Sequence, residues 1–134
     1  IVSGGTTSQI VARELGVEVK SSTEIYDKEV PPIAYIQGVD LVTEGVLTLS
    51  KTIDRLKSLS KSLDSDIFKA KDGASQMAKL LYSASHIKLL VGRSLNIANA
   101  ESSFQRDLEL RLHVIGELEK ILVKLGKIVT VEYY

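Results

Sequence analysis

The sequence predicts an α/β or α+β domain in which helices pack on a layered, mixed sheet. Two observations lead to this class: short apolar runs that are typical of strands alternate along the chain with amphipathic segments that are typical of helices. The chain has 134 residues, which is enough for one domain with its own core. We therefore interpret residues 1–134 as a single domain, with a candidate internal break near residues 63–72.

The N-terminal part of the chain predicts the end of a strand and then one helix. Ile1-Val2-Ser3 is typical of a strand that enters a turn. The next four residues, GGTT, can turn the chain and cap a helix from about Ser8 to Leu15, and Gly16 is a suitable C-terminal stop. The polar segment that follows, Val17 to Glu29, contains one short β-like stretch.

A hairpin and a longer helix are predicted next. Pro31-Pro32 imposes extended backbone on residues 33–36, and Gln37-Gly38 turns the chain into a second apolar run over residues 39–43. From Val46 onward, apolar residues recur at helical spacing. The basic residues of this helix are interpreted as a solvated face: Lys51, Arg55, Lys57 and Lys61.

The second half of the chain predicts two more helices and two strands. Residues 63–66 are the best candidate for a break, and Asp72-Gly73 is typical of the cap of a short helix behind it. His86 to Val91 is interpreted as a buried strand that Gly92 ends. The elements predicted beyond it are a long polar loop over residues 94–105, a helix over about 106–125 and an alternating strand over 127–134.

Composition narrows the function classes. Seventeen basic residues balance seventeen acidic ones, so the chain has no net positive charge that would attract it to nucleic acid. The sequence has no cysteine, which excludes disulfides and thiolate metal sites and fits a reducing compartment. No apolar run approaches the roughly 18 residues of a membrane helix, and no signal peptide is visible. We expect a soluble, cytoplasmic protein that binds no nucleic acid and has no membrane segment.

Charge is unevenly distributed along the chain. Residues 13–44 contain seven acidic and three basic residues, whereas residues 51–71 contain three acidic and six basic ones. This separation could orient a partner protein or a second copy of the chain, so a homo-oligomer is one expectation.

The segment from Gly38 to Gly45 carries the strongest candidate for chemistry. It is an apolar run that ends in Glu44 and Gly45, so a strand would deliver the carboxylate to the edge of the sheet. There Glu44 could bind a metal, or it could be a solvated turn carboxylate that the dipole of the next helix stabilises. Asp40 lies roughly 13 Å away along a regular strand, so it cannot bind the same ion and is interpreted as a turn or edge residue.

Two further candidate sites are polar. The GGTT sequence could present backbone N–H groups and hydroxyls to an anion at a helix start, or it could be a capped turn without a ligand. Two polar residues behind the predicted buried strand, Arg93 and Asn96, could contact a partner or a phosphate. The candidate anion-binding residues are Gly4, Gly5, Thr6 and Thr7.

Several short strings together carry a family resemblance that covers nearly the whole chain. They resemble the C-terminal half of bacterial stage II sporulation protein E family phosphatases, in a branch with GGTT and DLVTEGVLTL strings. The strings in this chain are GGTT at 4–7, IVAREL at 10–15, PPIAY at 31–35, VDLVTEGVLTL at 39–49, IKLLVGR at 87–93 and LGKIVTVEYY at 125–134.

The resemblance implies a PPM-type fold and a function in signalling. Such enzymes hydrolyse phosphoserine and phosphothreonine esters of a phosphoprotein substrate with a water held between two Mn²⁺ or Mg²⁺ ions, which bind oxygen ligands. Thr43-Glu44-Gly45 matches the place of a Thr-Asp-Gly motif whose aspartate binds metal, so Glu44 is carried over as the metal ligand.

Two departures from the family pattern argue against catalysis by this chain alone. The early Asp-Gly metal motif of the family is absent from the sequence, and we expect it upstream of Ile1, in an N-terminal catalytic part. Ser85-His86 stands where related sequences tend to have a carboxylate. The chain is therefore expected to be an inactive C-terminal part of the phosphatase, or alternatively a noncatalytic regulatory or protein-interaction module derived from that fold.

Overall fold

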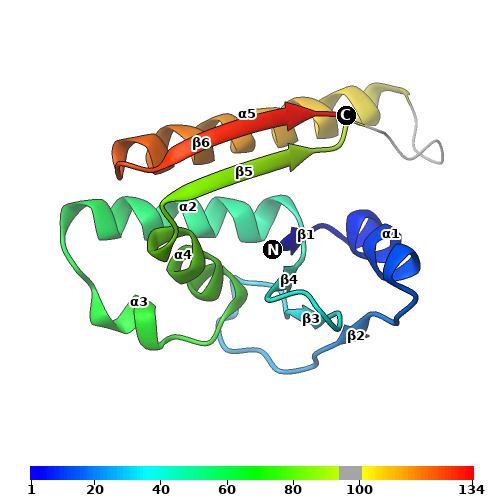
Figure 1. Cartoon of the computed structure of the whole chain (residues 1–134), viewed down its shortest axis with the longest axis horizontal. Helices are drawn as coiled ribbons and strands as arrows, with labels where there is room; N and C mark the ends of the chain where they lie inside the picture. The colour runs from blue at the N-terminus through cyan, green and yellow to red at the C-terminus, as the bar shows by residue number, and fades with distance from the viewer. Residues whose placement is uncertain (94–100) are drawn as a thin grey trace.

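The computed structural model describes residues 1–93 and 101–134, with side chains in the second range described from residue 105. Within these ranges the chain forms five helices, one four-stranded sheet and one two-stranded sheet (Figure 1). The predicted mixed α/β class is therefore confirmed. The strands, however, divide into two separate sheets, whereas the sequence predicted one layered sheet.

The four-stranded sheet is mixed and its strands are short. Its order is β1-β4-β3-β2: β1 and β4 run parallel, and the other two pairings are antiparallel. The predicted hairpin is confirmed by the pairing of Ala34 with Val42. The strands are β1 (Val2–Ser3), β2 (Lys20–Ser21), β3 (Ala34–Tyr35) and β4 (Val42–Thr43).

Helix α1 (Gly5–Leu15) begins earlier than the sequence predicted. Gly4 has a φ of 109°, which lets the chain turn sharply out of β1, so the helix starts at Gly5 and not at Ser8. Its end is as predicted, because Gly16 has a φ of 67° and its N–H contacts the last carbonyls of the helix.

Helix α2 (Val46–Lys61) ends just before the predicted break near residues 63–72, and the segment that follows contains one additional element. A short helix that the sequence did not predict, α3 (Ser65–Lys69), precedes α4 (Gly73–Ser83). The Asp72 side chain caps α4 as predicted, accepting a hydrogen bond of 2.9 Å from the Ser75 N–H.

The last three elements form a parallel two-stranded unit. Strand β5 (His86–Val91) pairs in register with β6 (Ile128–Tyr133), and α5 (Glu101–Lys124) lies between them in sequence (Figure 1). Two predictions were wrong here. Strand β5 is not buried but alternates, because only one of its faces is covered. Residues 101–105 are helical and not part of a loop, and residues 94–100 lie outside the described ranges.

One large core cluster joins helices α2 to α5 to both sheets. It contains Leu41 next to β4, Ile87 of β5 and the inward faces of the helices α2 to α5. The largest fully buried apolar side chains in the described ranges are Leu56, Met77, Leu122 and Val42. No helix in those ranges is long and apolar enough to cross a membrane.

Leu56→Ala tests the core of helix α2. Leu56 is fully buried, so the substitution leaves a cavity that should lower the free energy of unfolding by about 2–5 kcal/mol. Leu63→Ala is the matched control, because Leu63 is 74% exposed and its truncation should change stability by less than about 0.5 kcal/mol. Urea denaturation followed by circular dichroism measures both, and similar losses for the two variants would contradict this assignment of the core.

Candidate functional site

Strands β1 and β4 end side by side at one edge of the four-stranded sheet, here called the β1–β4 edge. Because they run parallel with Ser3 opposite Thr43, the residues that follow both strands meet at this edge. The Gly4 N–H donates to the Thr43 carbonyl at 2.9 Å. The Ser3 hydroxyl donates to the Glu44 carbonyl at 3.3 Å and accepts from the Thr43 hydroxyl at 3.3 Å. These bonds fix the two chain turns against each other.

Each of the two turns leads directly into a helix. Helix α1 follows Gly4 and α2 follows Gly45, and neither N-cap makes a side-chain hydrogen bond within the part of the chain that the structure describes. The first turns of both helices contain no acidic residue there. A Cβ at Gly45 would lie 3.9 Å from the Gly4 Cα, so the two turns are in contact. The edge therefore brings together two sets of first-turn N–H groups that no side chain caps.

The two helices leave the edge on opposite faces of the sheet. Val42 lies in the same core cluster as Ala12 of α1, whereas Leu41, its neighbour on the other face, lies in the same core cluster as Leu49 of α2. Figure 1 shows α1 and α2 leaving the neighbouring strands β1 and β4 in different directions. The edge thus has the geometry of a topological switch point, the place where open α/β sheets bind ligands.

The structure brings the predicted anion-binding residues and the predicted metal ligand to this one edge. Gly5, Thr6 and Thr7 are exposed in the first turn of α1, and Glu44 is exposed where β4 ends. Sequence reasoning treated the two groups separately, because the pairing of β1 with β4 is a long-range contact. The edge thus presents free amides, hydroxyls and one carboxylate to solvent.

The residues at this edge do not fit a divalent metal by themselves. In the described part of the chain, no three His, Cys, Asp or Glu side chains form a group that could hold a metal ion. Asp40 lies in the turn before β4, at the opposite end of the strand from Glu44, as the sequence predicted. His86 begins β5 in the other sheet, where its Nδ1 lies 3.1 Å from the Ser85 hydroxyl. The assignment of Glu44 as a metal ligand stays a prediction.

The other predicted site residues lie elsewhere. Arg93 is exposed behind β5, and its guanidinium carbon lies 5.7 Å from the centre of the Tyr133 ring, a contact within the two-stranded unit. Asn96 lies outside the described ranges. The predicted polar contacts at Arg93 therefore do not belong to the β1–β4 edge.

A partly buried ion-pair network around Arg55 was missed from the sequence. The Arg55 guanidinium contacts the Asp27 carboxylate at 2.9 Å and the Asp72 carboxylate at 3.3 Å. Its Nε donates to the Ser75 hydroxyl at 2.8 Å. Arg55 is thus not on a solvated face, as the sequence suggested, because it joins α2 to the start of α4 and to the loop before β3.

Lys51 was also predicted on the solvated face but is paired. Its ammonium donates to the Glu29 carboxylate at 2.7 Å. This hydrogen bond, with a smaller contribution from the Glu29 charge, raises the pKa of Lys51 above its ordinary value. The pair ties α2 to the loop before β3 on the same side as Arg55.

Thr48 lies in the first turn of α2 and is fully buried. Its hydroxyl oxygen has no hydrogen-bond partner among the residues that the structure describes. The start of α4 packs closely here: a Cβ at Gly73 would lie 3.0 Å from the Ile33 Cγ2 and 3.4 Å from the Thr43 Cγ2. The small residue at position 73 therefore lets the start of α4 pack closely against Thr43 of β4.

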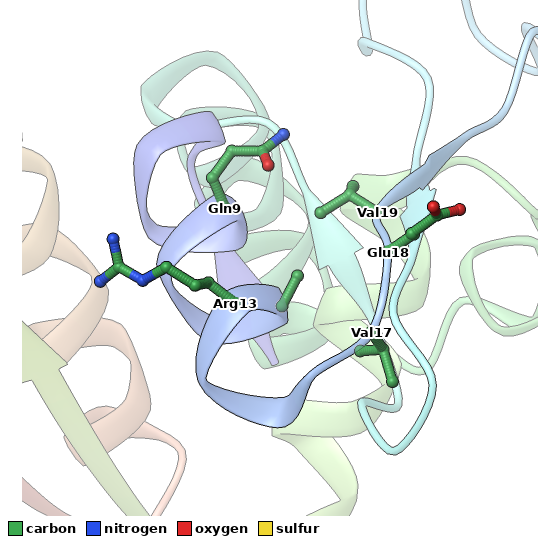
Figure 2. A pocket seen from close by; sticks show the side chains of 6 residues that line it. Gln9, Arg13, Val17, Glu18 and Val19 are labelled. Carbon is green, nitrogen blue, oxygen red and sulfur yellow. The ribbon is translucent and has the colours of Figure 1, made fainter.

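A shallow hollow of about 360 Å³ lies beside α1 (Figure 2). Figure 2 shows Gln9 and Arg13 on the helix and the segment from Val17 to Val19 on the opposite side. The hollow includes neither Glu44 nor the first turn of α1. It is thus separate from the β1–β4 edge.

The chain matches no family model, no curated protein and no solved structure in comparisons with known proteins. The fold and the geometry of the edge therefore carry the functional argument, together with the string resemblance.

Gly73→Ala tests the support of the edge by α4. The added methyl meets side chains of Ile33 and Thr43 at 3.0 and 3.4 Å, so we expect a loss of about 1–3 kcal/mol in the free energy of unfolding. Gly116→Ala in α5 is the matched control, because no atom lies within 4 Å of its added Cβ and alanine favours helices by about 0.5–1 kcal/mol. Urea denaturation should give opposite signs, and equal signs would refute the close packing at Gly73.

Proposed function

We propose that this chain is a noncatalytic C-terminal part of a PPM-type, metal-dependent serine/threonine phosphatase, and that its β1–β4 edge binds a phosphate-bearing ligand. The strings that resemble this phosphatase family support the first half of the proposal. The second half rests on one observation: two uncapped helix starts, on opposite faces of the sheet, meet at adjacent parallel strand ends.

Backbone groups at the edge suit a phosphate. The first N–H groups of a helix lack partners within the helix, and the helix dipole places partial positive charge beside them. Two such starts meet where Gly4 and Gly45 have no side chain between the turns. An oxygen-rich anion placed there would accept hydrogen bonds from both helices, as phosphates do at helix N-termini in other α/β proteins.

The hydroxyls and the carboxylate at the edge define the ligand further. Thr6 and Thr7 are exposed in the first turn of α1 and can donate to phosphate oxygens. Glu44 is exposed at the same edge, where its charge repels a bare polyanion and can accept a hydrogen bond from a hydroxyl. The ligand that fits is a phosphate ester with a hydroxyl close to the phosphate.

The donor set supports the noncatalytic half of the proposal. A two-metal phosphatase centre needs several oxygen ligands around both ions. In the part of the chain that the structure describes, Glu44 has no His, Asp or Glu neighbours that complete such a group. Hydrolysis of a phosphoprotein would then depend on other parts of the enzyme, while this chain serves binding or regulation.

Substitution of Thr6 tests phosphate binding at the edge. The helix dipole stabilises an aspartate in the first turn, so the Thr6→Asp variant should fold normally. The added negative charge should repel the ligand and weaken phosphate binding by about fivefold or more. Thr6→Asn keeps the size without the charge and should retain most of the affinity. The measurement is a titration of the ¹⁵N-labelled chain with glycerol 3-phosphate, a phosphate ester with a hydroxyl close to the phosphate, followed by NMR.

The position of the shifted amides decides the outcome. Binding at the edge should shift the amides of residues 4–7 and 45–48. The proposal fails if these amides do not move, or if Thr6→Asp and Thr6→Asn bind glycerol 3-phosphate equally well.

Hydrolysis of p-nitrophenyl phosphate with Mn²⁺ tests the noncatalytic role. We expect this chain alone to release no p-nitrophenol above the buffer rate, since it lacks a complete ligand group in its described ranges. In the whole phosphatase, Glu44→Gln should leave turnover within about twofold, whereas loss of a true metal ligand costs roughly 10–100-fold or more. A loss of that size would show that Glu44 binds metal and would overturn the noncatalytic assignment.

A further inference from the structure

A lysine-lined groove separates the C-terminal ends of two packed helices. Helices α2 and α5 bury apolar residues against each other, including Leu59 and Ile121. The groove lies beside this contact and has a volume of about 250 Å³. It forms near the C-terminal ends of both helices, whereas the β1–β4 edge lies at the N-terminal end of α2. The residues that line the groove are Lys57, Ser60, Lys61, Glu117, Lys120, Ile121 and Lys124.

The groove carries a strong excess of positive charge. Four lysines line it against one carboxylate, Glu117. The Lys120 ammonium contacts this carboxylate at 3.2 Å. This hydrogen bond and the Lys120 charge hold the pKa of Glu117 below its ordinary value, with a smaller contribution from Lys57. The single carboxylate is thus already engaged, and the other lysines share no second acidic residue in the lining.

The lysine spacing works against helix stability. Lys57 and Lys61 are four residues apart on α2, and Lys120 and Lys124 are four residues apart on α5. Like charges at this spacing are neighbours on one helix face and repel each other. Favourable interaction with the helix dipole accounts for the two last-turn lysines, Lys61 and Lys124, but the dipole effect fades within one turn. Lys57 lies outside the last turn of α2 and has no such compensation, whereas Lys120 is held by its ion pair with Glu117.

We propose that this groove binds a compact polyanion with two or more linked phosphate groups. Its four ammonium groups match an anion of several charges, and each can donate to a phosphate oxygen without the fixed geometry of arginine. A hollow of about 250 Å³ is small, which favours a small molecule over an extended chain. Among the described residues no aromatic ring lines it, so stacking of nucleic-acid bases is not part of the recognition.

A titration with pyrophosphate tests the proposal. Pyrophosphate should shift the amides of residues 57–61 and 120–124 in NMR spectra of the ¹⁵N-labelled chain. The double variant Lys61→Gln/Lys124→Gln should weaken binding about tenfold, since two of the four charges that face the anion are lost. The same variant should leave the thermal unfolding midpoint nearly unchanged without ligand, because the lost dipole interaction of the two last-turn lysines opposes the relief of like-charge repulsion.

Two controls separate a specific site from general attraction. Lys20→Gln/Lys28→Gln removes the same net charge outside the groove and should leave affinity within about twofold. Sulfate at matched ionic strength should give much smaller shifts at the groove. The proposal is overturned if the two double variants lose affinity equally, if sulfate acts like pyrophosphate, or if pyrophosphate shifts only the amides of the β1–β4 edge.

Discussion

The parallel pairing of β1 with β4 is the constraint on which the arrangement of this chain depends. Helix α1 and the strands β2 and β3 separate them in sequence, and β1 and β4 each contribute only two residues to the pairing. So short a ladder adds little stability by itself, and packing on both faces holds it in place. Val42 is 1% exposed on the face of α1, and Thr43 is 3% exposed on the face of α4. Once β1 and β4 are paired, the helices that follow them, α1 and α2, must begin at the same edge.

Local signals in the sequence were sufficient for most of the elements. Helices α2 and α4 followed from their apolar spacing, and the Asp72 cap of α4 followed from the Asp-Gly pair before an apolar run. These features depend on residues within one or two turns of each other, so a single sequence carries them. The same is true of the hairpin, whose turn residues Gln37-Gly38 adjoin both strands.

The features that the sequence did not predict depend on contacts between distant segments. Nothing local indicates that β1 pairs with β4, or that β5 pairs with β6 in a sheet separate from the first. Arg55 resembled a solvated residue because its partners, Asp27 and Asp72, are distant in sequence. The start of α5 was missed for a local reason, since residues 101–105 are mostly polar and resemble a loop.

The two proposed anion sites rest on different physics. The residues at the β1–β4 edge, 3–7 and 43–48, include one carboxylate and no basic side chain, so attraction there must come from backbone N–H groups and helix dipoles. Such groups are fixed in direction and do not titrate, which favours a ligand of defined shape over one of high charge. The groove between α2 and α5 relies on flexible ammonium groups, whose attraction falls steeply with salt. Raising the ionic strength should therefore lower the anion affinity of the groove much more than that of the edge. A highly charged anion without a defined hydrogen-bonding geometry should prefer the groove.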